Sequence, residues 1–184
     1  GLVVACGSTS NNKGTLSKAK IRRLKLEPIK VIASAGGARI EILDATGLFE
    51  AGGRHLSAKK YREALKHYDR LLVHYPKTRF TSPALYNAGL AHEALYEFDK
   101  AVLRYRELVR RFGKTRDAID ASFRLGGCLA ELHRWKDSAT VFGQLLTRKA
   151  LTAGDRIEAY ARKGLAHFRL DDHDQTRKTL IAAV

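Results

Sequence analysis

The sequence of 184 residues predicts an all-α fold, a superhelical stack of about four helix pairs. Glycines recur with a spacing of 37 or 38 residues, and small residues recur with the same spacing about a dozen positions later. The glycines are Gly52, Gly89, Gly126 and Gly164, and the small residues are Ala64, Ala101, Ser138 and Thr176. Such a period with helical patterning is typical of solenoids, in which each repeat packs on its neighbours.

Composition agrees with a helical, positively charged chain. There are only three prolines, and 34 Lys and Arg face 19 Asp and Glu, which gives a net charge of +15. This charge favours anionic partners such as an acidic protein face, anionic lipid or nucleic acid. The alternative is that the basic residues only form a solvated surface. Two cysteines, Cys6 and Cys128, are too few and too far apart for a disulfide framework or a zinc site.

The first residues form a short apolar run that ends at a cysteine. Residues 1–6 read Gly-Leu-Val-Val-Ala-Cys, which resembles the bacterial lipobox, although Val3 stands where leucine is usual. The resemblance implies that Cys6 is lipidated as the first residue of the mature protein. Residues 7–28 then form a basic, flexible tether that adds electrostatic attraction to a membrane. The alternative is an ordinary buried strand.

The next segment, 29–43, has the pattern of a short β-hairpin. Apolar residues alternate over 29–33 and again over 40–42, and Gly36-Gly37 lies between the two runs. We therefore expect a hairpin over 29–42. Because an isolated hairpin is marginally stable in water, it has to pack on the first repeat or pair with the sheet edge of a partner.

Each repeat then reads as two helices. In the second helix, apolar residues recur at offsets 0, 3, 4, 7, 10 and 11 from Tyr61, Phe98 and Trp135, which is the spacing of one helix face. A glycine on the first helix and a small residue on the second allow the two helices to approach closely. The predicted repeats within 44–184 are about 45–81, 82–118, 119–156 and 157–184.

These residues resemble the tetratricopeptide repeat, which implies a right-handed superhelix with a binding surface on its concave face. The first repeat supplies Leu48, Gly52, His55, Ala64, Tyr68, Leu71 and Pro76. The long period and the Tyr75-Pro76 turn are similar to bacterial cell-envelope members, such as the Tol–Pal-associated coordinator and the lipoprotein of the β-barrel assembly machine. The apolar residues 181–184 lack a polar cap, so we expect further sequence or a covering partner there.

No catalytic pattern is present in the sequence. There is no phosphate-binding glycine loop and no metal-ligand spacing, so we expect no enzyme activity, no cofactor and no metal. The acidic tract 171–174 aligns with the turn inside the fourth repeat, which indicates a turn and capping role.

The expected binding site is a peptide-binding row on the concave face. Aromatic residues and hydrogen-bonding residues stand there at equivalent positions of successive repeats. Asn87 and Arg124 match part of the carboxylate clamp of chaperone-binding members, although the other clamp positions differ. Ordinary packing between repeats is the alternative. The row consists of Phe49, Tyr86, Asn87, Phe123, Arg124 and Arg162.

The sequence thus predicts a non-catalytic protein–protein interaction scaffold. We expect an outer-membrane lipoprotein on the periplasmic face, attached through Cys6 and the basic tether, which assists assembly of a β-barrel, a secretin or a motility machine. The alternative is a cytoplasmic adaptor that associates with nucleic acid through its charge. Nucleic acid is the less expected partner, because Glu50 interrupts the row of matched polar side chains that a base-reading repeat needs.

Overall fold

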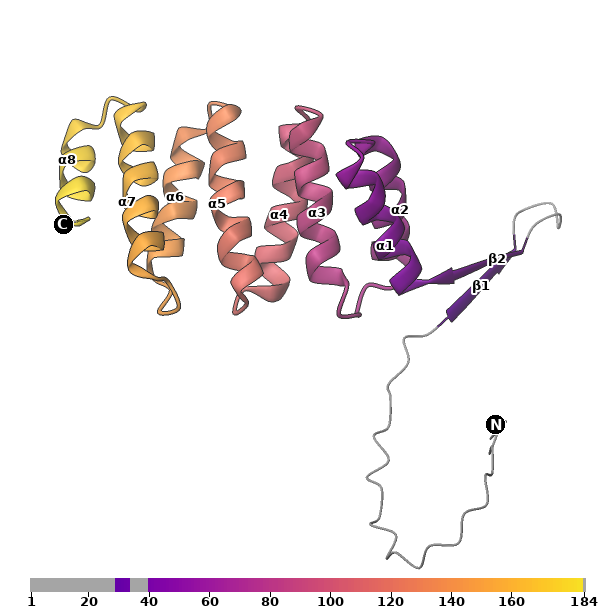
Figure 1. Cartoon of the computed structure of the whole chain (residues 1–184). Helices are drawn as coiled ribbons and strands as arrows, with labels where there is room; N and C mark the ends of the chain where they lie inside the picture. The colour runs from indigo at the N-terminus through magenta and orange to yellow at the C-terminus, as the bar shows by residue number, and fades with distance from the viewer. Residues whose placement is uncertain (1–28, 34–39, 184) are drawn as a thin grey trace, which may run out of the picture.

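The computed structural model describes residues 29–33 and 40–183, and in this part of the chain eight helices form one stack (Figure 1). Each helix packs on the next one in chain order, which confirms the predicted helical-repeat fold. None of the described helices is long and apolar enough to cross a membrane. The helices are α1 (Ala45–Ser57), α2 (Tyr61–His74), α3 (Thr81–Ala94), α4 (Phe98–Phe112), α5 (Arg116–Glu131), α6 (Trp135–Leu146), α7 (Ala153–Phe168) and α8 (His173–Ile181).

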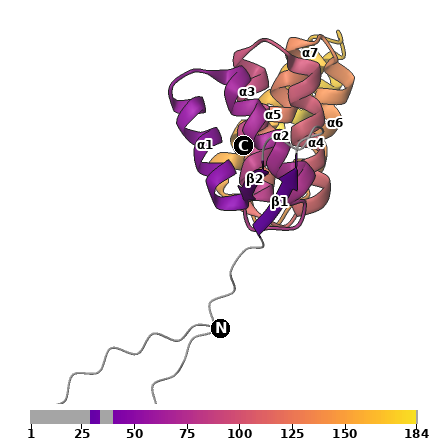
Figure 2. The ribbon, with the colours of Figure 1, turned by 90° about the vertical axis from the view of Figure 1, so that its right-hand side faces the viewer.

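Two strands precede the helices where the sequence predicts a hairpin. β1 (Ile29–Ala33) and β2 (Ile40–Asp44) pair antiparallel over all five of their residues. β2 runs directly into α1. At this junction the Asp44 carboxylate accepts hydrogen bonds from the amides of Thr46 and Gly47, both at 3.0 Å, and so caps the helix. The strands extend from the α1 end of the stack (Figures 1 and 2).

Several helices begin at a side-chain cap that the local sequence supplies. The Thr115 hydroxyl accepts the amide of Ala118 at the start of α5. At the start of α7, Thr152 and Asp155 form a reciprocal capping box, with hydrogen bonds of 3.1 Å and 3.0 Å. These caps satisfy amides that have no acceptor inside the helix.

The turn inside each helix pair contains one residue with a left-handed backbone. The φ angles lie between 56° and 58°, and none of the four residues is glycine. They are Lys59, Tyr96, His133 and Asp171. In the fourth repeat, Asp172 follows and accepts the amide of Gln175 at 3.0 Å as the cap of α8. The acidic tract 171–174 therefore forms a turn and a cap, as the repeat register indicates.

The core runs along the interior of the stack. Its largest fully buried side chains are the aromatic residues at one repeat position, Tyr68, Tyr105 and Phe142. Each of these rings packs against the glycine of its own repeat, which confirms the predicted close approach of the paired helices. The small residue on the second helix is buried too in the first three repeats, and the Ser138 hydroxyl donates to the Gly126 carbonyl oxygen at 2.8 Å.

Polar contacts join neighbouring repeats. Arg104 of α4 pairs with Asp69 of α2 at 2.6 Å, and the Ser82 hydroxyl of α3 donates to Asp117 of α5 at 2.7 Å. Partners in such contacts lie about one repeat apart in sequence, so these two interfaces carry specific bonds in addition to apolar packing.

Candidate functional site

The six residues of the predicted row all lie on the first helix of a pair. They are Phe49 on α1, Tyr86 and Asn87 on α3, Phe123 and Arg124 on α5, and Arg162 on α7. Each aromatic ring of the row is partly buried against the core ring of its own repeat. Tyr86 meets Tyr105 edge-on with ring centroids 5.8 Å apart, and the equivalent pairs are Phe49–Tyr68 and Phe123–Phe142, both at 6.1 Å.

Asn87 is engaged inside the chain. Its amide nitrogen Nδ2 donates to the Tyr68 hydroxyl at 3.2 Å, so it links α3 to α2. Breaking this bond for a ligand would leave the oxygen of a buried tyrosine without its partner. In this structure Asn87 therefore serves the interface between the first two repeats.

The second half of the row borders a cavity of about 470 Å³ between α3, α5 and α7. Three of the predicted residues line it, namely Phe123, Arg124 and Arg162, whereas Phe49, Tyr86 and Asn87 do not. The other lining residues come from the ends of α3 and α5, the turn after α3 and the start of α4. They are Glu93, Tyr96, Phe98, Gly127, Cys128 and Glu131.

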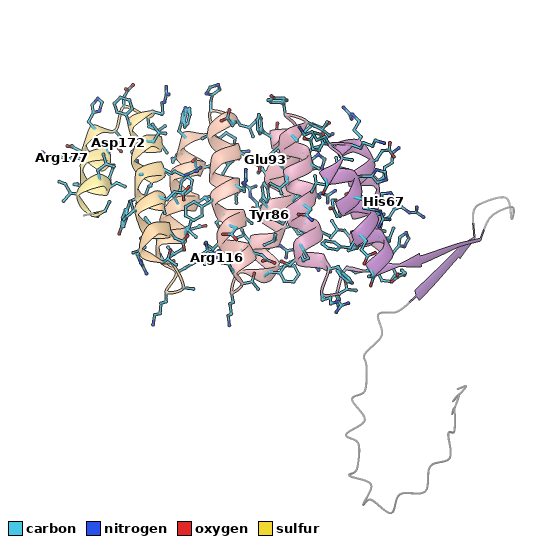
Figure 3. The ribbon with its side chains drawn as sticks, in the orientation of Figure 1. His67, Tyr86, Glu93, Arg116, Asp172 and Arg177 are labelled. Atoms are coloured by element: carbon cyan, nitrogen blue, oxygen red, sulfur yellow. The ribbon has the colours of Figure 1, made fainter. Side chains whose placement is uncertain are left out.

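Glu93 is the centre of a polar cluster in the cavity wall. It is the penultimate residue of α3, farther along the helix than Tyr86 (Figure 3). The Tyr105 hydroxyl donates to Oε1 at 2.5 Å, and Arg124 Nη1 donates to Oε2 at 3.3 Å. Burial, together with Glu93, raises the pKa of the Tyr105 hydroxyl well above its usual value and that of the Cys128 thiol to about 12. Both groups are therefore protonated and neutral at pH 7.

The arginines of the site differ in their partners. Arg124 pairs with Glu93 across the α3–α5 interface, whereas Arg162 pairs with Glu158 one turn earlier on its own helix, at 2.7 Å. About half of each arginine side chain is exposed. The cavity thus holds charges of both signs beside three aromatic residues, and this mixture suits a peptide better than a purely apolar ligand.

Sequence reasoning missed Glu93, Tyr96 and Glu131. Repeat register places Tyr96 in a turn, and the other repeats carry lysine, histidine and aspartate at that position. The tyrosine at this turn position was therefore the sequence signal that could have identified it as a site residue. Glu93 and Glu131 end the first helices of repeats two and three, beyond the positions that the row samples. The proposed lipid site at Cys6 lies outside the described residues.

A family model described as tetratricopeptide repeat matches residues 83–115, which span most of α3 and all of α4. Solved structures of such repeats share the architecture. MamA of AMB-1 has a TM-score of 0.64 and 15% identity, and the match covers 77% of this chain and 72% of that chain. YrrB, described as a TPR protein with an unusual peptide-binding site, has a TM-score of 0.59 and 18% identity over 76% of this chain and 66% of its own.

A tetratricopeptide repeat protein from Parabacteroides merdae ATCC 43184 has a TM-score of 0.62 and 15% identity, over 73% of this chain and 50% of its own. No curated protein sequence matches the chain. At these identities the likeness shows the fold. The stack of helix pairs defines a helical-repeat protein with the tetratricopeptide-repeat fold.

Proposed function

We propose that the chain is a non-catalytic scaffold that binds a peptide segment of a partner protein in the cavity between α3, α5 and α7. The observation that carries this proposal is the cavity itself, in which partly exposed aromatic rings stand beside ionic side chains on rigid helices. The fold supports it, since repeats of this kind form extended concave binding surfaces, and YrrB is described with a peptide-binding site.

The chemistry of the cavity favours binding over catalysis. A cysteine nucleophile acts as its thiolate, and the raised pKa of Cys128 keeps it as a thiol at neutral pH. The Glu93 carboxylate is occupied on both oxygens by Tyr105 and Arg124, so it is poorly placed as a general base.

Peptides selected for binding to the chain test whether the cavity is a peptide-binding site. Dodecapeptides would be chosen from a random phage-displayed library on the immobilised chain and measured against Phe123→Ala. We expect this variant to weaken binding about tenfold. The control is Arg177→Ala on α8, at the far end of the stack from α3 (Figure 3). Equal binding to both variants, or failure to select any peptide, would overturn the proposal.

We further propose that the scaffold works as a lipoprotein on the periplasmic face of the outer membrane, where it brings envelope proteins together during assembly of a β-barrel, a secretin or a motility machine. The Val-Val-Ala-Cys sequence and the basic stretch after it support this attachment. Mass spectrometry of the chain from its native source tests it. Acyl chains on Cys6 are expected, and an unmodified internal Cys6 would contradict the anchor.

A further inference from the structure

The charges that line the cavity are not equally engaged. Arg124 pairs with Glu93 and Arg162 with Glu158, so both cations already have anionic partners. Glu131, at the end of α5, forms no ion pair with any residue in the described part of the chain. The group left for a ligand is therefore a carboxylate. An anionic ligand would have to share Arg124 with Glu93 or Arg162 with Glu158.

Tyr96 faces the same cavity in an unusual state. Its side chain is 82% exposed, and its backbone has a φ of 58°, a conformation that costs bulky residues free energy. Turn geometry does not require an aromatic ring there, because lysine, histidine and aspartate stand at the same turn position in the other repeats. A strained, exposed aromatic residue at the mouth of a cavity indicates a contact with a ligand.

The Tyr96 backbone and the Tyr96 ring each have one local contact beside the cavity. The Tyr96 amide donates to the Glu93 carbonyl oxygen at 2.9 Å, and its ring stands at 87° to that of Phe98, with centroids 6.1 Å apart. Phe123, held against Phe142, supplies a further aromatic wall. Aromatic faces carry negative electrostatic potential, and together with a free carboxylate they select a cation.

We propose that this cavity binds a lysine or arginine side chain of the partner peptide, stacked on Tyr96 and paired with Glu131. The inference rests on the proposed function, since it names the residue that anchors the peptide in that cavity. It makes the site a reader of basic residues, although the chain as a whole carries a charge of +15.

The repeats themselves supply variants that the fold accepts. Ala94 occupies the position of Glu131 in the second repeat and Arg169 occupies it in the fourth, so Glu131→Ala and Glu131→Arg each reproduce a residue that the fold already accommodates there. The matched control is Asp174→Asn, an exposed carboxylate at the start of α8. Tyr96→Asn removes the ring and inserts a residue that tolerates a left-handed backbone.

The experiment is a double-mutant cycle with the phage-selected dodecapeptides. In each peptide that loses affinity for Phe123→Ala, we expect one Lys or Arg whose replacement by Gln weakens binding about tenfold. Glu131→Ala should weaken the parent peptide similarly without further loss for the Gln peptide, and Glu131→Arg should bind a peptide with Glu at that position. Asp174→Asn should change nothing.

Two outcomes would overturn the inference. One is a peptide that loses affinity for Phe123→Ala but keeps its affinity after both Glu131→Ala and the Gln replacement. Such a peptide would bind in the cavity without this anchor, and the proposed function would stand. The other concerns Tyr96→Asn, which should weaken binding while the thermal midpoint stays the same or rises. Full binding by this variant, or a loss of binding that follows a loss of stability, would show that the ring does not act as an anchor.

Discussion

A methyl group added to Gly52 would lie 2.5 Å from Cε1 of Tyr68, the fully buried ring on the next helix. No pair of non-bonded carbon atoms tolerates such a distance, so the ring would have to shift against the core that encloses it. Gly89 meets Tyr105 and Gly126 meets Phe142 in the same way. The periodic glycine is therefore the complement of the periodic aromatic ring sixteen residues later.

Gly52 and its neighbour Gly53 give a sharp test of this relationship. A methyl group at Gly53 would meet only the Tyr68 hydroxyl oxygen, at 4.0 Å. We expect Gly53→Ala to stabilise the fold by about 1 kcal/mol through helix propensity. Gly52→Ala should destabilise it by about 1–3 kcal/mol through overpacking. Urea denaturation of both variants checks this, and effects of the same sign would contradict the close-contact explanation.

Much of the fold could be predicted because two independent sequence positions recur with the same period. Glycine and small residue share one period, and the apolar offsets of the second helices are identical in three repeats. The left-handed turn residues could not be predicted. Glycine and asparagine are the usual signals for that backbone, and this chain uses neither at any of the four described turns. Hydrogen bonding across the turn and packing of the paired helices override the local preference.

The turn after α1 offers a stabilising substitution. Lys59 is exposed and has a φ of 57°, which costs an L-residue with a side chain about 1 kcal/mol. Lys59→Gly removes this cost, so we expect the free energy of unfolding to rise by about 1 kcal/mol. The control is the adjacent exposed Ala58, with a φ of −78°, where glycine should lower stability. A calorimetric midpoint lower for Lys59→Gly than for the parent would refute the strain argument.

The binding site was predictable only in part. Register placed Phe123, Arg124 and Arg162 on the face that borders the cavity. Register did not distinguish the residues that line the cavity from Phe49 and Tyr86, which pack against core rings. A half-buried ring that supports the core has the same sequence pattern as a ring that lines a cavity. That distinction depends on how neighbouring repeats are spaced, which sequence periodicity does not specify.

Asp155 links α7 to α5 and should make stability depend on pH. The hydrogen bond from Arg116, at 2.6 Å, and the Thr152 backbone hold the pKa of Asp155 well below its usual value. A lowered pKa in the folded state means that the unfolded chain binds more protons at pH values between the folded pKa and the unfolded pKa of about 4. The contribution of Asp155 is therefore complete above the unfolded pKa and is lost as pH falls towards the folded pKa.

We expect Asp155→Asn to lower the free energy of unfolding by about 1–2 kcal/mol at pH 7, through the lost cap and ionic hydrogen bonds. The difference from the parent should shrink as pH falls from about 5 to about 2. Denaturation curves over this range measure it, with Asp174→Asn as the control. A difference that stays constant with pH would show that Asp155 acts through helix capping geometry alone.

The fourth repeat repeats the pattern with weaker packing. Leu180 stands where the other repeats bury an aromatic ring, and it is 46% exposed, whereas Phe142 is 2% exposed. Ile157 of α7 is 58% exposed, whereas its counterpart Ile119 in the third repeat is 3% exposed because it packs on the repeat that follows. Each repeat therefore depends on its successor for part of its burial.

In the 184-residue chain we accordingly expect α8 to open before the rest of the stack. Its amides should exchange with deuterium faster than those of α4 and α6, since opening α8 exposes little buried apolar surface. Leu180→Ala should cost about 1 kcal/mol or less, because its side chain is already half exposed. Phe142→Ala should cost about 3–5 kcal/mol. If α8 amides were protected as strongly as those of α6, the half-exposed Leu180 would have to be covered in solution, and the nearest-neighbour account of this repeat would be wrong.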